Sequence, residues 1–341
     1  MQGPGDRGQV KNLTIIGGGS WGTALAIVLA PRFARVRLWV YEADLAARMR
    51  ETRENDVYLP GCRLPGHVEV VSQLPSALDG AEIVLSAAPS HLVRGLYQQM
   101  LPFLHQSMVF VSATKGLENG TLLRMSDVIR GVLQACMAPR VAVISGPTFA
   151  LEVARFEPTA LVVASTDSAL SECVQAAFSG PTFRLYANSD PIGVELGGSV
   201  KNVVAIGAGV LHGLGLGHNA MAALITRGLA EITRLAVAMG GAAQTLAGLA
   251  GLGDLVLTCS GDLSRNRTVG VELAHGRKLE EIVSSMKMVA EGIKTTNAVA
   301  DLAKGHSVAM PISEQMLQML HFEVSPREAI QRLMDRSLKG E

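Results

Sequence analysis

The chain has no surplus of either charge. Lys and Arg together number 30, as do Asp and Glu, so the formal net charge of the 341 residues is zero. Proteins that bind nucleic acids or anionic membranes usually carry a basic patch that shifts this balance. We therefore expect no nucleic-acid partner. A small anionic ligand would have to be bound by charges gathered locally.

Cysteine is also scarce. The four cysteines (Cys62, Cys136, Cys173 and Cys259) lie far apart and form no C-x-x-C pair. This spacing argues against a disulfide scaffold and a zinc site, and a reducing compartment is the simplest interpretation. No Ser/His/Asp set or His/Cys cluster stands at the spacing of a nucleophilic or metal site, so we expect no metal.

A membrane-directing segment is not evident. Residues 1–9 are Gly-rich and polar, and we expect a disordered lead-in rather than a signal peptide. Residues 202–226 contain no Asp, Glu, Lys or Arg, but the glycines within 213–217 should break a helix. We expect two buried helices and a turn there, not a membrane span.

What is present is a short N-terminal motif. Residues 13–16 have the composition of a buried strand, and a helical run of small and apolar residues covers 24–30. Between them lie Gly17, Gly19 and Gly22 at G-x-G-x-x-G spacing. These glycines allow a sharp turn, close approach of a pyrophosphate and tight helix packing. The motif predicts a dinucleotide-binding turn; the alternative is a glycine turn that only packs a helix on a sheet.

Further strands alternate with helical segments up to about residue 189. They are predicted at 36–40, 83–88, 108–113, 141–145, 161–164 and 183–186, with a Pro/Gly-rich loop at 55–67. This alternation predicts an α/β Rossmann-type domain with a mostly parallel, doubly wound sheet. Ligands of such sheets bind beyond the carboxyl ends of the strands, where Lys115 and residues 146–150 fall.

The pattern changes near Asp190-Pro191, which could form an N-cap and a first helical residue. Beyond this point helices and turns follow without strand alternation. We therefore expect two domains, a dinucleotide-binding domain over 1–189 and an all-helical domain over 190–341.

Two charges in the helical part stand among glycine and aliphatic residues. Lys201 is costly to bury without a partner, and a desolvated lysine near another cation suits proton exchange near neutral pH. The alternative is a lysine whose ammonium reaches solvent at a helix edge. Asp254 could pair with Lys201 and orient it, or could cap a short helix.

Other polar residues leave alternatives open. Glu42 lies twenty positions after Gly22, where an acid often binds the ribose hydroxyls of NAD, but it could instead cap the next helix. Several arginines (Arg32, Arg48, Arg50 and Arg53) could meet the 2′-phosphate of NADP, so the cofactor preference stays open. Residues 264–267, Ser-Arg-Asn-Arg, suit a phosphate or form a solvated cluster.

These stretches together resemble the bacterial form of the NAD(P)-dependent glycerol-3-phosphate dehydrogenase family. The likeness covers nearly the whole chain from Lys11 onward, in the right order. The motifs that carry it are IIGGGSWGTA at 15–24, ATKGLE at 113–118, ISGPTFA at 144–150, GGSVKNV at 197–203, AGLGDL at 250–255, SRNR at 264–267 and VAEG at 289–292.

The resemblance implies reversible reduction of dihydroxyacetone phosphate to sn-glycerol 3-phosphate with NADH or NADPH, for glycerophospholipid synthesis in the cytoplasm. It implies that Lys201 is the general acid/base, with Asp254 beside it, and that Lys115 contacts both substrate and cofactor. Substrate contacts are implied for Gly146, Thr148, Lys201, Asp254, Ser264, Arg265 and Asn266. Cofactor contacts are implied for Ser20, Trp21, Tyr41, Ala150, Arg265, Val289 and Glu291, beside Gly17, Gly19 and Gly22.

We further expect a homodimer. Two alternative functions remain at this point. One is another β-hydroxyacid-type dehydrogenase, such as a phosphogluconate or ketopantoate reductase, which shares the Rossmann-plus-helical plan. The other is a dinucleotide-sensing protein without turnover, although Lys201 and Asp254 argue against it.

Overall fold

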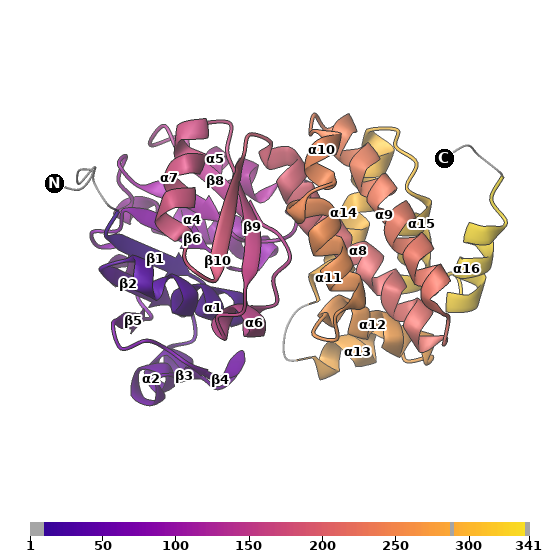
Figure 1. Cartoon of the computed structure of the whole chain (residues 1–341), viewed down its shortest axis with the longest axis horizontal. Helices are drawn as coiled ribbons and strands as arrows, with labels where there is room; N and C mark the ends of the chain where they lie inside the picture. The colour runs from indigo at the N-terminus through magenta and orange to yellow at the C-terminus, as the bar shows by residue number, and fades with distance from the viewer. Residues whose placement is uncertain (1–9, 287–289, 338–341) are drawn as a thin grey trace. The chain divides into compact units, whose positions relative to one another are not determined.

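The computed structural model describes residues 10–286 and 290–337, and it divides the chain into two compact units (Figure 1). Unit 1 comprises Met1–Thr114, Met125–Ile144 and Thr148–Pro191, and unit 2 comprises Lys115–Arg124, Ser145–Pro147 and Ile192–Glu341. The expected lead-in, 1–9, lies outside the described residues. Two short segments that follow strands of unit 1 thus belong to the helical unit, which the sequence did not suggest.

Unit 1 is built on an eight-stranded sheet in the order β10-β9-β8-β7-β6-β1-β2-β5. Every strand pair whose register is defined in this sheet is parallel, as the alternation of strands and helices predicted. The strands are β1 (Asn12–Ile16), β2 (Arg35–Trp39), β5 (Val68–Val71), β6 (Ile83–Ser86), β7 (Val109–Ser112), β8 (Arg140–Ser145), β9 (Thr159–Ala164) and β10 (Phe183–Asn188).

The prediction of a loop over 55–67 is wrong in part. β3 (Glu54–Asn55) and β4 (Leu59–Arg63) form a two-stranded antiparallel sheet, and edge strand β5 follows. β4 contains Pro60 and Gly61, which are depleted in strands because they weaken the ladder. An edge strand of four residues likewise gives little periodic signal.

Helices cover both faces of the sheet, and each face has its own apolar cluster. Side chains of α1, α2, α6 and α7 pack with Leu13 and Ile15 of β1, whereas those of α3, α4 and α5 pack with Ile16. The alternation of strand side chains produces these two cores. The helices are α1 (Ser20–Leu29), α2 (Ala43–Thr52), α3 (Leu74–Leu78), α4 (Val93–Met100), α5 (Met125–Leu133), α6 (Ala150–Ala154) and α7 (Ser168–Phe178), with short 3₁₀ turns η1 (Ala30–Arg32), η2 (Ser90–Leu92) and η3 (Leu101–Phe103).

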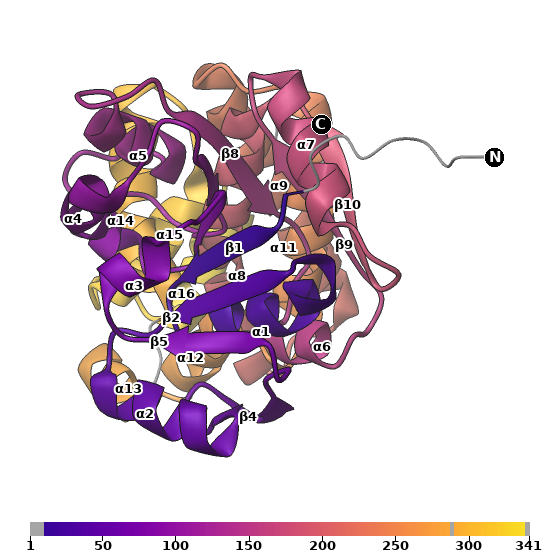
Figure 2. The ribbon, with the colours of Figure 1, turned by 90° about the vertical axis from the view of Figure 1, so that its left-hand side faces the viewer.

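Figure 2 shows β1, β2 and β5 side by side at one end of the sheet. The strand order reverses at β1, which lies between β2 and β6. Such a switch point opens a crevice beyond the carboxyl ends of the strands. The glycine turn after β1 lies there, since the backbone N–H of Gly17 donates to the carbonyl of Trp39 at the end of β2 (3.1 Å).

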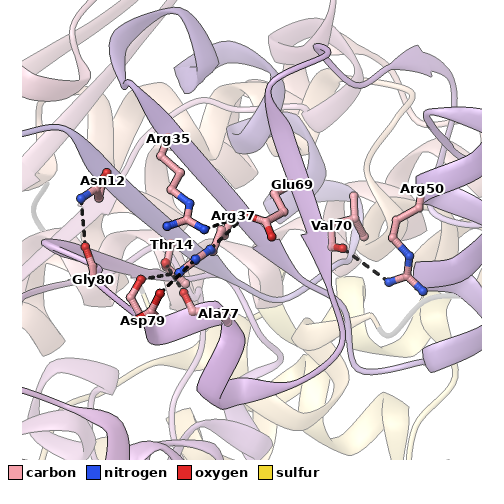
Figure 3. A network of polar contacts seen from close by, with 10 residues as sticks. All are labelled: Asn12, Thr14, Arg35, Arg37, Arg50, Glu69, Val70, Ala77, Asp79 and Gly80. Carbon is pink, nitrogen blue, oxygen red and sulfur yellow. Dashed lines mark hydrogen bonds and ion pairs between the residues drawn. The ribbon is translucent and has the colours of Figure 1, made fainter.

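A polar network fixes the β1–β2–β5 end of the sheet (Figure 3). Arg37 of β2 is buried, and its guanidinium pairs with Glu69 of β5 (3.1 Å) and Asp79 after α3 (3.3 Å). Arg35 pairs with Glu69 as well (3.2 Å), and the Thr14 hydroxyl donates to the carbonyl of Ala77 (2.6 Å). The buried guanidinium is therefore matched by acceptors, as burial of a charge requires.

In the part of unit 2 that the structure describes, the regular structure is helical apart from Ser145, the last residue of β8, and one isolated antiparallel bridge between Leu117 and Arg124. Its helices are α8 (Pro191–Gly213), α9 (His218–Ala238), α10 (Ala243–Leu246), the π-helical turn η4 (Leu249–Gly253), α11 (Asp254–Ser260), α12 (Arg265–Ala274), α13 (Leu279–Ser285), α14 (Glu291–Gly305), α15 (Pro311–Leu320) and α16 (Pro326–Met334). α8 begins at Pro191 and the chain turns between Gly213 and His218, as predicted.

α8 is the one helix, among the described residues, that is long and apolar enough to cross a membrane by length and composition. Its most apolar 18-residue window is fully buried inside the structure. Small and aliphatic residues on every side of α8 pack against the surrounding helices of the unit. α8 therefore has the character of a core helix, and it carries Lys201 into this core.

Candidate active site

Two lysines share one buried carboxylate in unit 2. Asp254 is 0% exposed, and its Oδ2 accepts a hydrogen bond from Lys115 Nζ at 2.8 Å. Its Oδ1 accepts a short hydrogen bond from Lys201 Nζ. Lys201 is only 5% exposed, so its ammonium does not reach solvent at a helix edge. The pairing of Lys201 with Asp254 that the sequence suggested is present.

Close packing of α8 on η4 makes this meeting possible. A Cβ on Gly197 would lie 2.4 Å from the carbonyl oxygen of Ala250, so a side chain there would force the two segments apart. Asp254 is the first residue of α11 and follows η4 directly, so it does not cap the helix. A π-helical turn changes the direction of the side chains that follow it, and such turns are frequent at functional sites.

Thr258 completes the contacts of Lys201. It lies one turn after Asp254 on α11, and its hydroxyl donates to the carbonyl of Asp254 (2.6 Å). The same hydroxyl oxygen accepts from Lys201 Nζ at 2.6 Å. Because an ammonium has three N–H donors, Asp254 and Thr258 together use two and fix the direction of the third.

Burial lowers the pKa of Lys201 from 10.5 to about 8. The charge of Asp254 raises this pKa, and the nearby ammonium of Lys115 lowers it. The balance leaves an ammonium that is protonated at neutral pH yet acidic enough to release a proton. This is the property required of a general acid/base that works near pH 7.

The segment that carries Lys115 is fastened to α8. The backbone N–H of Gly116 donates to Ser199 Oγ (3.0 Å), and Ser199 Oγ donates to the carbonyl of Glu195 (2.7 Å). Lys115 Nζ also donates to the carbonyl of Gly146 at 2.9 Å. These contacts explain why residues 115–124 and 145–147 belong to the helical unit.

A second polar group lies at the start of α12. Ser264 caps this helix by accepting the N–H of Arg267 (3.3 Å). Asn266 is buried, donates to Asn202 Oδ1 (3.0 Å) and accepts the N–H of Gly292 (3.0 Å). Ser264 and Asn266 are buried and Arg267 is half-buried, whereas Arg265 is exposed, so residues 264–267 are solvated only in part. Asn202, the neighbour of Lys201, links them to α8.

Arg265 is the first residue of α12, and Glu291 is the first residue of α14. Burial lowers the pKa of Arg265, and the charge of Glu291 raises it. The side chain of Arg265 is nevertheless exposed, so its guanidinium is only partly desolvated. A guanidinium at a helix N-terminus is a favourable group for a phosphate, because both the fixed charge and the helix N–H groups attract an anion.

The glycine turn of unit 1 fits a dinucleotide. Apart from its chain neighbours, no atom of the described residues lies within 4 Å of the position of a Cβ on Gly19, whereas a Cβ on Gly22 would lie 1.8 Å from the carbonyl oxygen of Gly17. α1 begins at Ser20 without a side-chain cap, so the N–H groups of its first turn are directed at the open side of Gly19. Trp21 Nε1 is a buried donor that meets no acceptor within the described residues.

Comparison with known proteins identifies the family of the chain along most of its length. The family description "NAD-dependent glycerol-3-phosphate dehydrogenase N-terminus" matches residues 12–171, and the corresponding C-terminus matches residues 190–331. The chain belongs to the NAD-dependent glycerol-3-phosphate dehydrogenase family.

Individual relatives agree with this membership. A glycerol-3-phosphate dehydrogenase [NAD(P)+] of Koribacter versatilis is 57% identical over 329 residues, which cover 96% of this chain and 98% of the relative. The crystal structure of a glycerol-3-phosphate dehydrogenase from Coxiella burnetii superposes with a TM-score of 0.91 at 41% identity, covering 96% and 99% of the two chains. A ketopantoate reductase from Ralstonia eutropha shares only the fold, with a TM-score of 0.57 at 15% identity over 94% and 99% of the two chains.

The remaining residues implied by the family resemblance lie in both units. Thr148 and Ala150 lie in unit 1 at the end of β8 and the start of α6, and both are half-buried. Tyr41 follows β2, is 78% exposed and contacts the Trp39 ring edge-on. Val289 lies outside the described residues.

Sequence reasoning missed two further residues that contact this site, Thr258 and Ser199. Thr258 stands four positions after Asp254, and this spacing puts both on one face of a helix once the helix is recognised. Ser199 stands two positions before Lys201 but acts on the backbone beside Lys115. No local pattern in the sequence indicates such a contact.

Proposed function

We propose that this chain reduces dihydroxyacetone phosphate to sn-glycerol 3-phosphate with a reduced nicotinamide dinucleotide, reversibly. The observation that carries the proposal is the pair of lysines on the buried carboxylate of Asp254. Hydride addition to a ketone develops an alkoxide, and the preorganised ammonium groups of Lys115 and Lys201 oppose that charge. Membership in the glycerol-3-phosphate dehydrogenase family supports the same substrate.

Lys201 serves as the general acid in reduction and the general base in oxidation. Its third N–H is available for the ketone oxygen, since the other two are used by Asp254 and Thr258. Lys201 transfers this proton to the developing alkoxide and takes another from solvent afterwards. Because its pKa is lowered, Lys201 can donate a proton during reduction and accept one during oxidation near neutral pH.

The phosphate of the substrate binds at the start of α12. Arg265 supplies a guanidinium, Ser264 and Asn266 supply polar groups, and helix N–H groups face the anion. Gly146 and Thr148 flank the substrate from the loop after β8. Holding the phosphate orients the ketone, and orientation contributes up to roughly 7 kcal/mol or more to lowering a reaction barrier.

Unit 1 binds the dinucleotide through Gly17, Gly19 and Gly22, with Ser20 and Trp21 at the start of α1. When bound, the reduced nicotinamide supplies the hydride. Further cofactor contacts come from Tyr41, Lys115, Ala150, Arg265, Val289 and Glu291. Most of these cofactor contacts lie in the expected domain 1–189, and Lys201, Asp254 and the start of α12 lie in 190–341. Each expected domain also supplies residues to the other task, since Lys115, Gly146 and Thr148 lie in 1–189 and Arg265, Val289 and Glu291 in 190–341.

We also propose that the protein is a cytoplasmic homodimer that supplies glycerophospholipid synthesis. Four cysteines, none of them in a disulfide among the described residues, support a reducing compartment. Light scattering of the purified chain tests the dimer: a mass near twice 35.9 kDa supports it, and a monomer mass contradicts it.

The activity is tested by following the absorbance of reduced nicotinamide with dihydroxyacetone phosphate present. Consumption of the cofactor and formation of sn-glycerol 3-phosphate are expected. Ketopantoate and unphosphorylated dihydroxyacetone serve as controls. Turnover of ketopantoate at an equal rate, or cofactor binding without any turnover, would overturn the proposal.

A further inference from the structure

Glu42 is placed to decide between the two nicotinamide dinucleotides. It follows β2 at the switch-point side of the sheet, and its carboxylate is exposed. It occupies the first flanking position of α2, yet its side chain makes no capping hydrogen bond. Its Oε1 instead accepts the hydroxyl hydrogen of Tyr58 at 2.9 Å. The helix-cap alternative thus leaves the side chain unexplained.

Two residues of the segment around β3, Asn55 and Tyr58, link Glu42 to the glycine turn through a series of hydrogen bonds. Asn55 is 0% exposed, and its Nδ2 donates to the carbonyl of Gly18 and to Thr23 Oγ1, both at 2.8 Å. Asn55 Oδ1 accepts the backbone N–H of Tyr58 at 3.0 Å. Tyr58 then reaches Glu42. The turn that faces the pyrophosphate and the carboxylate beyond β2 are therefore fixed relative to each other.

The four arginines that could meet a 2′-phosphate donate hydrogen bonds to other groups of the protein. Arg48 makes two hydrogen bonds to the carboxylate of Asp56 (3.2 and 3.3 Å). Arg50 donates to the carbonyl of Val70 (3.4 Å), as Figure 3 shows, and Arg53 donates to the carbonyl of Val68 (2.9 Å). Arg32 donates to the carbonyl of Ala176 (3.1 Å).

No cation stands directly beside Glu42 in the sequence, because its neighbours are Tyr41 and Ala43. A 2′-phosphate carries between about −1.5 and −2 charges at neutral pH, so it needs a cation and is repelled by a carboxylate. A ribose 2′-hydroxyl is instead a good donor to that carboxylate.

We propose that Glu42 accepts the adenosine ribose hydroxyls and makes this chain prefer NADH over NADPH, and that Tyr58, braced by Asn55, is the positioning residue for Glu42. The inference rests on the proposed function only for the class of cofactor, since it concerns binding in unit 1. It resolves a preference that the composition of this region leaves open.

The test is a fluorescence titration of the purified chain with NADH and with NADPH, without substrate. The native chain is expected to bind NADH at least about tenfold more tightly. Glu42→Gln is expected to lower that ratio by about tenfold, because a neutral amide accepts the ribose hydroxyls more weakly than a carboxylate and no longer repels the 2′-phosphate. Tyr58→Phe is expected to lower it less, and to have no further effect in the Glu42→Gln background.

Asp44→Asn is the matched control, because Asp44 is an exposed carboxylate in the first turn of α2. It removes the same charge two residues away, and the ratio is expected to stay unchanged. Thermal melting checks that every variant folds. Equal or tighter binding of NADPH by the native chain overturns the inference. So does an equal effect of Asp44→Asn and Glu42→Gln, or an effect of Tyr58→Phe that persists without Glu42.

Turnover separates this inference from the proposed function. If NADH binds preferentially but dihydroxyacetone phosphate is not reduced, the substrate assignment fails and the role of Glu42 stands. If dihydroxyacetone phosphate is reduced with NADPH as efficiently as with NADH, the enzyme assignment stands and the role of Glu42 fails.

Discussion

Replacing Lys201 with methionine separates the catalytic role that we propose for it from its effect on stability. The drop of its pKa from 10.5 to about 8 corresponds to a cost of about 3 kcal/mol for keeping the ammonium charged in the folded state, at about 1.36 kcal/mol per pH unit. Lys201→Met removes this cost, and Asp254 retains its ion pair with Lys115. The free energy of unfolding at pH 7, measured by urea titration, is therefore expected not to fall and to rise by up to about 3 kcal/mol.

The same variant loses the proton donor. General acid catalysis contributes about 10²–10⁴-fold, and the charge that opposes the alkoxide contributes further. We expect kcat for dihydroxyacetone phosphate reduction to fall by about 10³-fold or more. Lys201→Arg is the matched control, because arginine keeps the charge but does not release its proton in proteins. A kcat of either variant within about tenfold of the native value would refute the assignment.

The pH dependence follows from the same group. In reduction Lys201 must be protonated, so kcat is expected to fall as pH rises through about 8; in oxidation it must be neutral, so kcat is expected to rise there. The free energy of unfolding also depends on the protonation of Lys201, over a pH range that begins near the same pKa. The unfolded chain binds more protons than the folded chain between pH about 8 and 10.5, so this group makes stability increase with pH across that range. A reduction profile that stays flat from pH 7 to 9.5 would contradict the role of Lys201.

Three further predictions concern its surroundings. Thr258→Val removes an acceptor of Lys201 and should lower kcat by about tenfold with little change in KM. Thr258→Ser keeps the hydroxyl and should retain activity. Equal kcat values for the two variants would argue against orientation of Lys201 by the hydroxyl. Arg265→Ala should raise the KM for the phosphorylated substrate by about tenfold or more in steady-state assays, and an unchanged KM would contradict its binding of phosphate. Gly197→Ala should lower the free energy of unfolding by about 1–3 kcal/mol in urea titrations, because its Cβ would lie 2.4 Å from the Ala250 carbonyl oxygen. Gly95→Ala is the control and should not lower this free energy, because no atom of the described residues lies within 4 Å of its Cβ position.

The parts of the fold and site that the sequence predicted are those with a local signal. The strand, the glycine turn and the start of α1 follow each other within fifteen residues, and each has its own composition. Lys201 and Asp254 stand out because an isolated charge among apolar residues is rare without a partner. Their pairing could be guessed from charge alone, although 53 residues separate them.

The parts that the sequence could not predict depend on contacts between distant or irregular segments. β4 contains Pro60 and Gly61, and its partner β3 has only two residues, so neither shows strand periodicity. Asn55 and Tyr58 looked like loop residues for this reason, and their link to Glu42 was missed. The assignment of residues 115–124 to the helical unit likewise depends on Ser199, whose hydroxyl lies in the middle of a helix.

The shared carboxylate gives the proposed site a local positive charge, although the chain as a whole has no net charge. With Lys115 and Lys201 both protonated, the cluster at Asp254 carries one positive charge in a buried setting, where electrostatic interactions are strong. Without Asp254 the two ammonium groups would repel each other, and burial of both would be prohibitive. Without Lys115 the pair would be neutral, and the pKa of Lys201 would rise because a nearby cation would no longer oppose protonation. Only the combination of two cations, one anion and burial gives both a positive field for the alkoxide and a proton that can be released near neutral pH.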